Sequence, residues 1–381
     1  MKKPMIFLIC CSLFLFSGCS KSQNTDSGEN EHTVTGKMEL SFAEQFSVDR
    51  CSDGCSIIST GGEKYLLVPS ESNDKDHGAN CGMTVIRQPE NNIYLAASSA
   101  MDFFDELGLL DRVKFTSTSA ENWSLENVKK AVSDEDIFYV GKYSAPDYEF
   151  LLSEGCTLAV ESTMINHNPE VREQLTRLGI PVLTERSSYE SHPMGRTEWI
   201  KLYGLILGKE EEADAFFMKK LETFRKVSEE STENVTEEKT AVFFYITSNG
   251  YVNVRKPGDY ISKMISLAGG KYIFTDEDLN TDTNELSTMN MQMEDFYLKA
   301  KDADFIIYNS AIDGAIETRE QLISKSELFR DFKAVRENNV WCTGQNIFQK
   351  TSGTADMTAD IKQMFGDENR CGEYTFIRHV E

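Results

Sequence analysis

The feature that most constrains this sequence is a long helical pattern with alternating strands and helices on both sides of it. Residues 196–231 carry apolar side chains at the spacing of three and four that marks a buried helical face. Gly208 interrupts this pattern and predicts a break between two helices. Because chains of this length commonly split into domains, the segment predicts a stiff connection between two lobes. A crossover helix inside one large domain fits the same pattern and is the alternative.

The first block, residues 37–195, predicts an N-terminal α/β lobe. Residues 37–90 have the short apolar runs and the Gly61-Gly62 pair that are typical of hairpins. From Asn92 on, repeated strand–loop–helix units imply a parallel sheet. The predicted strands of these units are residues 93–97, 113–116, 137–140, 158–161 and 180–183.

The second block, residues 232–381, repeats the alternation and predicts a C-terminal α/β lobe. Its predicted strands are residues 241–246, 305–308 and 339–342. The predicted fold class is therefore α/β, with two parallel-sheet lobes joined by a long interlobe helix. Ligands of open α/β sheets bind beyond the carboxyl ends of the strands, and pockets favour domain interfaces. A ligand cleft between the lobes is expected.

Residues 1–19 are typical of a lipoprotein signal peptide, with Lys2 and Lys3 ahead of an apolar run of about a dozen residues. This run is too short to cross a bilayer about 30 Å thick as a helix. It ends in Phe16-Ser17-Gly18-Cys19, which resembles a bacterial lipobox, so Cys19 is expected to be lipidated. A cleaved signal without lipid is the alternative. Residues 20–36 are polar and predict a flexible tether, which places the chain outside the cytoplasm, anchored to the cell membrane in a periplasm or at the outer face.

The net charge of −23 argues against nucleic-acid binding and against electrostatic attraction to anionic lipids. Beyond the leader the cysteines are even in number, which permits disulfides in an exported protein without fixing their connectivity. Cys51 and Cys55 could close a small loop or, less favourably, hold a metal. Their spacing has no matching second pair, so no metal held by the protein is predicted. The cysteines concerned are Cys51, Cys55, Cys81, Cys156, Cys342 and Cys371.

Several segments resemble one known family. A strand and a loop of small residues precede residues 101–113, which look like the opening segment of class III substrate-binding proteins. These are the lipoprotein receptors of ABC importers for ferric siderophores, haem and cobalamin. Residues 179–182 and 205–210 resemble the second half of the family's first lobe, and residues 291–296 with 303–307 resemble a stretch of its second lobe. The resemblance covers residues 92–365.

The resemblance implies that one carboxylate on each lobe docks onto arginines of a permease dimer. By position these residues are Asp102 and Glu294, although the family usually has glutamate where Asp102 stands. Asp105 and Glu106 on the same predicted helix are the fallback candidates. The competing interpretation is that all of these are solvated carboxylates on helix faces without a partner.

The loops at the expected cleft supply aromatic rings and cations, which suit a flat or macrocyclic ligand with carboxylate, phosphate or catecholate oxygens. Arg196 could instead pair with Glu190 or Glu198. Met164 and His167 also raise the question of haem-iron ligation, whereas His167 could simply cap the next helix. The predicted ligand-binding residues are Trp123, Lys142, Tyr143, Met164, His167, Tyr189, Arg196, Tyr251 and Arg255.

Sequence motifs of common hydrolases, metalloproteases and phosphate-binding loops are absent. Together with the resemblance, this predicts a monomeric extracytoplasmic solute-binding lipoprotein that is not an enzyme. It would capture a ferric siderophore, haem or a corrinoid as ligand, with no intrinsic cofactor, and deliver it to an ABC permease. A lipid-anchored hydrolase that works through carboxylates and a surface adhesin are the alternatives.

Overall fold

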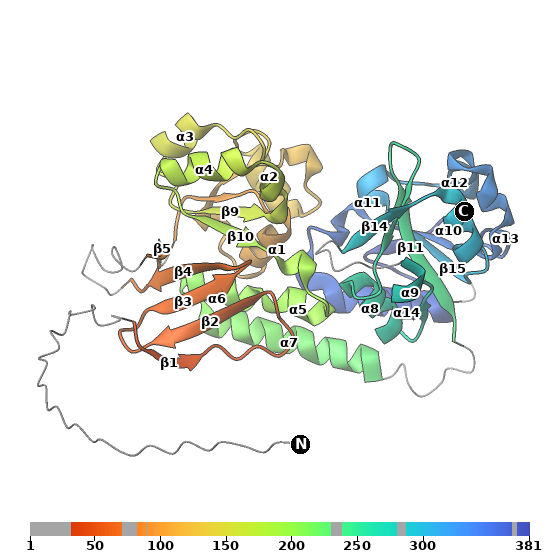
Figure 1. Cartoon of the computed structure of the whole chain (residues 1–381), viewed down its shortest axis with the longest axis horizontal. Helices are drawn as coiled ribbons and strands as arrows, with labels where there is room; N and C mark the ends of the chain where they lie inside the picture. The colour runs from red at the N-terminus through yellow and green to blue at the C-terminus, as the bar shows by residue number, and fades with distance from the viewer. Residues whose placement is uncertain (1–31, 71–81, 89, 230–237, 280–286, 368–371) are drawn as a thin grey trace, which may run out of the picture.

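A computed structural model describes residues 32–70, 82–88, 90–229, 238–279, 287–367 and 372–381. Two lobes lie side by side, and the long helix α7 (Glu210–Glu229) runs beneath both in the view of Figure 1. The leader with Cys19, residues 20–31 of the predicted tether, Cys81 and Cys371 lie outside the described residues. None of the helices in the described ranges combines the length and the apolar character needed to cross a membrane.

The N-terminal lobe opens with a five-stranded sheet that confirms the predicted β-rich edge. Its strands run in the order of the chain, antiparallel from β1 to β4, with β5 parallel to β4. β1 includes residues 34–36, which were predicted as tether, because pairing with β2 satisfies the backbone although the side chains stay exposed. The strands are β1 (Val34–Lys37), β2 (Phe46–Cys51), β3 (Ser56–Thr60), β4 (Glu63–Val68) and β5 (Thr84–Arg87).

A second, fully parallel sheet forms the rest of this lobe in the order β10-β9-β6-β7-β8, as the strand–loop–helix units predicted. Helices and apolar clusters cover its two faces, which is why its strands read as continuous apolar runs. The strands are β6 (Ile93–Leu95), β7 (Val113–Thr116), β8 (Phe138–Tyr139), β9 (Ala159–Ser162) and β10 (Val182–Glu185). The helices are α1 (Ser98–Glu106), α2 (Glu126–Ser133), α3 (Tyr148–Ser153) and α4 (Pro169–Arg177).

The predicted interlobe segment, with its break between two helices, consists of three helices: α5 (Pro193–Glu198), α6 (Ile200–Leu207) and α7. Gly208 ends α6 in the left-handed conformation, with φ of 72°, which confirms the break predicted there. A Cβ on Gly204 would lie 2.4 Å from the Cβ of Ala213, so glycine allows α6 and α7 to pack closely. The buried face of α7 joins the core of the N-terminal lobe through Ala213, Phe217, Leu221 and Phe224.

The C-terminal lobe has one sheet in the order β14-β12-β11-β15-β16-β17, with β13 also paired to β11. Its centre, β11, β15 and β16, is parallel as predicted, but β12, β14 and β17 pair antiparallel at the edges. Strand β12 lies between β14 and β11 and alternates buried and half-buried residues, so it lacks the apolar run that marks the parallel strands. The strands are β11 (Thr240–Ile246), β12 (Val252–Arg255), β13 (Lys271–Tyr272), β14 (Thr288–Met291), β15 (Phe305–Tyr308), β16 (Val340–Thr343) and β17 (Ile377–His379).

Helices pack against this sheet and form with it one large hydrophobic core that contains many aromatic rings. The last helix, α14, returns to the linking helices and packs against α7. The helices are α8 (Tyr260–Leu267), α9 (Asp276–Leu279), α10 (Met293–Ala300), α11 (Ser310–Asp313), α12 (Arg319–Lys325), α13 (Lys333–Arg336) and α14 (Thr354–Gly366). The fold class is thus two α/β lobes, each with a parallel centre, joined by helices.

Candidate functional site

The loops after the central strands are where an open α/β sheet binds ligands. In the N-terminal lobe, residues 140–147, 163–167 and 186–189 follow β8, β9 and β10. In the C-terminal lobe, residues 247–251, 309–310 and 344–350 follow β11, β15 and β16. Direct contacts across the lobes therefore identify which of these loops face one another.

Gln349, after β16, bridges to the loop after β7 in the opposite lobe. Its Oε1 accepts hydrogen bonds from the backbone N–H of Ser124 at 2.7 Å and from the hydroxyl of Ser124 at 2.6 Å. Its Nε2 donates to the carbonyl of Asn122 at 2.8 Å. One side chain from the C-terminal lobe thus holds a backbone turn of the N-terminal lobe.

Trp123 lies between those two residues, but its ring does not face the ligand region. The side chain is buried in the core of the N-terminal lobe, and Nε1 donates to the carbonyl of Thr118 at 3.0 Å. The prediction that Trp123 binds ligand is therefore wrong. An indole buries its large apolar area in a core whenever one local carbonyl can accept its N–H.

Asp102, the first predicted docking carboxylate, is also buried, with 1% of its surface exposed. It accepts a hydrogen bond of 2.6 Å from the backbone N–H of Ser352 in the short 3-10 turn η7 (Thr351–Gly353) of the opposite lobe. Burial raises the pKa of Asp102 to about 6, although that hydrogen bond acts in the opposite direction. Asp102 therefore joins the lobes and cannot dock a permease from the surface. Of the two fallback candidates, Glu106 is exposed and Asp105 half-buried.

A cluster of cations and rings lies where α5 meets the start of α8. The guanidinium of Arg196 stacks 4.3 Å from the ring centre of Tyr260, and that of Arg255 lies 5.8 Å from the same ring. Arg255 also lies 5.4 Å from the ring of Phe348 and pairs with Asp259 at 3.3 Å. Two predicted ligand-binding arginines, one from each side of the lobe boundary, thus meet at one aromatic ring.

The charges in this cluster do not balance. Asp259 is the carboxylate beside the two arginines. Burial lowers the pKa of Arg255, but the opposing effect of Asp259 and of nearby tyrosines is larger, so the pKa is raised overall. Arg196 is almost fully buried, and among the described residues its Nε finds no hydrogen-bond partner. The cluster therefore has surplus positive charge and an unused donor.

The alternative partners proposed for Arg196 are engaged elsewhere. Glu198 accepts hydrogen bonds from the backbone N–H groups of residues 41–43, and Glu190 accepts from those of residues 44 and 45 and from Nε1 of Trp199. Both carboxylates therefore hold the loop before β2 against the linking helices. The idea that either one neutralises Arg196 is not supported by these contacts.

The remaining predicted ligand residues are accessible. Lys142, Met164, His167 and Tyr251 are exposed, while Tyr143 and Tyr189 are half-buried. Tyr189 lies 4.9 Å from the guanidinium of Arg186. His167 ends the 3-10 turn after β9, and α4 begins beyond it with Asn168 at its N-cap, so the capping alternative for His167 is wrong.

A hollow of about 660 Å³ lies between the lobes beside this cluster. His192 lines it, caps α5 by accepting the N–H of Met194 at 3.1 Å, and has its pKa lowered to about 4 by burial and then by Lys263. The lining residues from the N-terminal lobe are Leu40, Ser41, Phe42, Ala43, Glu44, Ser191 and His192, and those from the C-terminal lobe are Pro257, Gly258 and Lys263.

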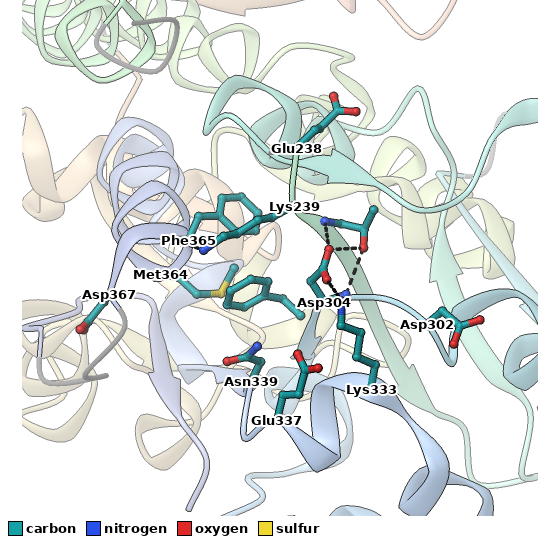
Figure 2. Close-up of a pocket in the computed structure, with 12 residues that line it drawn as sticks. Glu238, Lys239, Asp302, Asp304, Lys333, Glu337, Asn339, Met364, Phe365 and Asp367 are labelled. Atoms are coloured by element: carbon teal, nitrogen blue, oxygen red, sulfur yellow. Dashed lines mark hydrogen bonds and ion pairs between the residues drawn. The ribbon is translucent and has the colours of Figure 1, made fainter. Parts of the chain in front are cut away.

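Figure 2 shows another hollow, at the amino ends of the C-terminal strands. Thr240 begins β11 and donates its backbone N–H to Asp304 at 2.7 Å, and Asp304 also pairs with Lys333. Since ligands of open α/β sheets bind at the opposite strand ends, this hollow is not the candidate ligand site.

One buried carboxyl group stands apart in the parallel sheet. Glu161, near the carboxyl end of β9, is fully buried, and among the described residues neither of its oxygens has a hydrogen-bond partner. Burial raises its pKa to about 8, against a smaller opposing effect of Arg172. The group is therefore protonated at neutral pH and adds no charge beside the ligand loops.

The second predicted docking residue, Glu294, is exposed at the second position of α10. An equivalent position in the N-terminal lobe was not singled out from the sequence. Glu149 is exposed at the second position of α3, and α3 leads into β9 as α10 leads into β15. Both lobes therefore present an exposed glutamate at the start of a helix that precedes a parallel strand.

Comparison with known proteins places the chain among extracytoplasmic binding proteins. The profile of the periplasmic binding protein family matches residues 94–346. An uncharacterised lipoprotein of Methanocaldococcus jannaschii is 25% identical over 310 residues, which cover 77% of this chain and 70% of the relative.

Two solved structures share the fold at low identity. A periplasmic haem-binding protein from Pseudomonas aeruginosa has a TM-score of 0.61 and 14% identity, covering 77% of this chain and 98% of that one. The catecholate-siderophore-binding protein VctP of Vibrio cholerae has a TM-score of 0.55 and 13% identity, covering 72% and 94%.

Proposed function

The chain belongs to the periplasmic binding protein family, and from this premise we propose that it captures an anionic metal chelate between its lobes and delivers it to an ABC permease. Ferric siderophores and haem are the candidate anionic ligands, and a corrinoid, which would not depend on the surplus positive charge, is the alternative. The proteins of this family bind substrates and are not enzymes, which removes the hydrolase alternative. The names of the two structural relatives, one for haem and one for a catecholate siderophore, support this choice of ligands.

The surplus positive charge at the lobe boundary is the observation that carries the proposal. Arg196 and Arg255 share one ring, and Asp259 balances only one of them. A buried charge without a partner costs several kcal/mol, so an anionic ligand at this point gains by neutralising it. The guanidinium fork matches carboxylate and catecholate oxygens.

Aromatic side chains beside the arginines support a flat or macrocyclic ligand. Phe348 is half-buried next to Arg255, and Tyr251 and Tyr189 are accessible on the loops after β11 and β10. Rings of this kind contribute contact area at little entropic cost, while the arginines fix the orientation. Met164 and His167 on the loop after β9 stay candidate contacts for a haem.

Titration with haem, a ferric catecholate complex and cyanocobalamin, followed by the quenching of tryptophan fluorescence, tests the proposal. Arg255→Lys keeps a charge beside Asp259 but loses the fork, and it should weaken binding of the anionic ligand by about tenfold or more. Arg330→Lys makes the same change at an exposed arginine in η5 (Glu327–Asp331), so it is the matched control and should bind as the unchanged chain does. Loss of binding in Arg330→Lys with full binding in Arg255→Lys would contradict the assignment.

Docking is proposed to use Glu149 and Glu294, one exposed carboxylate from each lobe. Both sit in the first turn of a helix that precedes a central strand. Reconstituted uptake should fall strongly in Glu149→Ala with Glu294→Ala, while chelate binding in solution stays unchanged. Glu126→Ala, which removes an exposed carboxylate from the first turn of α2, is the control, and full uptake in the double variant would refute this docking pair.

Lipid anchoring at Cys19 remains part of the proposal, and it lies outside the described residues. The lipoprotein relative supports it. Radiolabelled palmitate should enter the unchanged chain and not Cys19→Ala. Equal labelling of the two would rule out Cys19 as the lipidated residue.

A further inference from the structure

We propose that His32, Asp53 and Cys55 form a zinc site that ties the start of the folded chain to the β2–β3 hairpin. This site is distinct from the chelate-binding region. Two of its residues lie in the turn between β2 and β3, at the end of the N-terminal sheet that faces away from the C-terminal lobe (Figure 1). Its role would be structural, independent of the chelate that the proposed function assigns to the lobe boundary.

The side-chain atoms are placed for one cation. One imidazole nitrogen, one carboxylate oxygen and the thiol sulfur all lie within 4.8 Å of one another. Nδ1 of His32 and Oδ2 of Asp53 are 2.7 Å apart. Tetrahedral zinc, with bonds of about 2.0–2.3 Å, separates its ligand atoms by roughly 3.3–3.8 Å. The cluster therefore needs only shifts of about 1 Å to surround the ion.

The backbone holds the three residues together before any ion binds. The N–H of Ser52 donates to the carbonyl of Thr33 at 2.9 Å, which fixes the residue after His32 beside the hairpin loop. Within the loop, the N–H of Cys51 donates to the carbonyl of Cys55 at 2.9 Å, and Gly54 supplies a φ of 84° that a side chain would disfavour. Oδ1 of Asp53 accepts the N–H of Cys55 at 3.0 Å, which leaves Oδ2 facing His32.

Burial and ligand type favour zinc over other cations. The side chains of His32 and Asp53 are only 7% and 19% exposed, and Cys55 is buried. Sulfur, nitrogen and one oxygen form a ligand set of intermediate softness, which suits Zn²⁺ and not Ca²⁺ or Mg²⁺. Binding would displace the thiol proton of Cys55 to water as the Zn–S bond forms, and a water molecule would complete the tetrahedron.

The Cys51–Cys55 spacing alone gave little support for a metal because the nitrogen ligand is not part of that motif. His32 precedes the first strand, about twenty residues earlier, and antiparallel pairing of β1 with β2 brings it to the loop. Cys51 lies outside the cluster of ligand atoms. The sequence motif therefore contributes one thiol and one carboxylate, and strand pairing adds the imidazole.

Zinc content and affinity test the site on the full chain, purified without a polyhistidine tag and kept reduced. We expect one zinc per chain in competition with a chromogenic zinc chelator. Loss of an outer partner of a metal ligand already costs about 10–100-fold in affinity. Cys55→Ser and His32→Gln should therefore each weaken binding by more than about tenfold, and Cys156→Ser, at a half-buried thiol elsewhere in the lobe, should not.

Alkylation gives a second measurement that does not depend on variants. Zinc should protect Cys55 from iodoacetamide, as read by mass spectrometry, and a chelator should remove the protection. His32→Gln changes a side chain ahead of the first strand, so it keeps the test open if Cys55→Ser does not fold. Equal zinc affinity in His32→Gln and Cys156→Ser, equal alkylation of Cys55 with and without zinc, or a Cys51–Cys55 disulfide in the purified chain would overturn the site. Failed chelate binding with intact zinc binding would count against the proposed function only.

Discussion

The two lobes hold the linking helices by different kinds of contact. The N-terminal lobe does so with apolar packing, because the buried faces of α6 and α7 are part of its main core. The C-terminal lobe contributes Ala355 and Leu267 to that core and otherwise meets the same helices through polar groups. Thr197 of α5 contacts the carbonyl of Thr351 and the hydroxyl of Thr354, and Lys220 of α7 pairs with Asp356 of α14.

This difference indicates which contacts can be exchanged. Apolar packing of α7 cannot be broken without opening a core, whereas hydrogen bonds of the kind formed by Gln349, Asp102 and Thr351 resemble those of transient interfaces. The linking helices therefore belong to the N-terminal lobe, and the polar contacts are the place where the lobe angle could adjust to a ligand. The four predictions below test that difference.

Phe217→Ala should have the largest effect. Phe217 is buried in the N-terminal core from α7, and truncation of a core phenylalanine costs about 3–5 kcal/mol in the free energy of unfolding. Met218, the next residue, is exposed, so Met218→Ala should change little. Urea unfolding of both variants measures this, and similar costs for the two would show that α7 is not anchored as described.

Glu161→Gln tests the buried carboxyl group of the parallel sheet whose oxygens have no hydrogen-bond partner among the described residues. Its pKa is raised to about 8 in the folded chain, above the ordinary value of 4.5, so its contribution to stability is present below pH 4.5 and is lost as the pH rises to about 8. The variant should gain up to a few kcal/mol at pH 8 relative to the unchanged chain and nothing at pH 4. Thermal unfolding across this range decides, and parallel pH curves would contradict the assignment.

Asp102→Ala should weaken the polar contact between the N-terminal lobe and η7 of the C-terminal lobe. It leaves the buried N–H of Ser352 without its acceptor, which costs about 1–3 kcal/mol. The pKa of Asp102 is raised because burial disfavours its charged form. The stability that protonated Asp102 contributes to the folded chain is therefore lost as the pH rises from about 4 to about 6. Asp102→Asn keeps an acceptor oxygen and should be nearly neutral while removing that pH dependence. A cost as large in Asn as in Ala would argue against the hydrogen bond.

Lys220→Ala should have the smallest effect. Its ion pair with Asp356 at 3.2 Å is partly exposed, and such pairs contribute about 0–1 kcal/mol and weaken with salt. A double-mutant cycle with Asp356→Ala measures the coupling. A coupling energy above about 2 kcal/mol that persists in high salt would mean that the polar contact is as firm as the apolar one.

Local patterns predicted the central strands, the break at Gly208 and the two-lobe α/β architecture, because continuous apolar runs and glycine have local causes. The antiparallel strand β12 was missed because it alternates buried and half-buried residues and lacks a continuous apolar run. Site residues were the weakest predictions. Trp123 and Asp102 stand in loops or helices of the expected kind, yet contacts with Thr118 and Ser352 turn them inward.

The two predicted ligand-binding arginines illustrate the same limit of the sequence. Arg196 and Arg255 were named separately, and the structure brings them to the same ring of Tyr260, a residue that no sequence pattern marked. The imidazole of residue 32 likewise reaches the carboxylate and thiol at residues 53 and 55 only through strand pairing. Residue types can be read from a sequence, whereas their meeting points follow from sheet register and helix packing.

Strand β1 has a mechanical consequence. It is an edge strand with β2 as its neighbour in the sheet and with all four residues exposed, so a pull on the chain from its N-terminal side acts on its hydrogen bonds one pair at a time. Bonds loaded in this way open in sequence, as in a zipper, and resist less force than bonds loaded together. A cation held by His32 would lie next to the first of these hydrogen bonds, where the opening of the strand would begin.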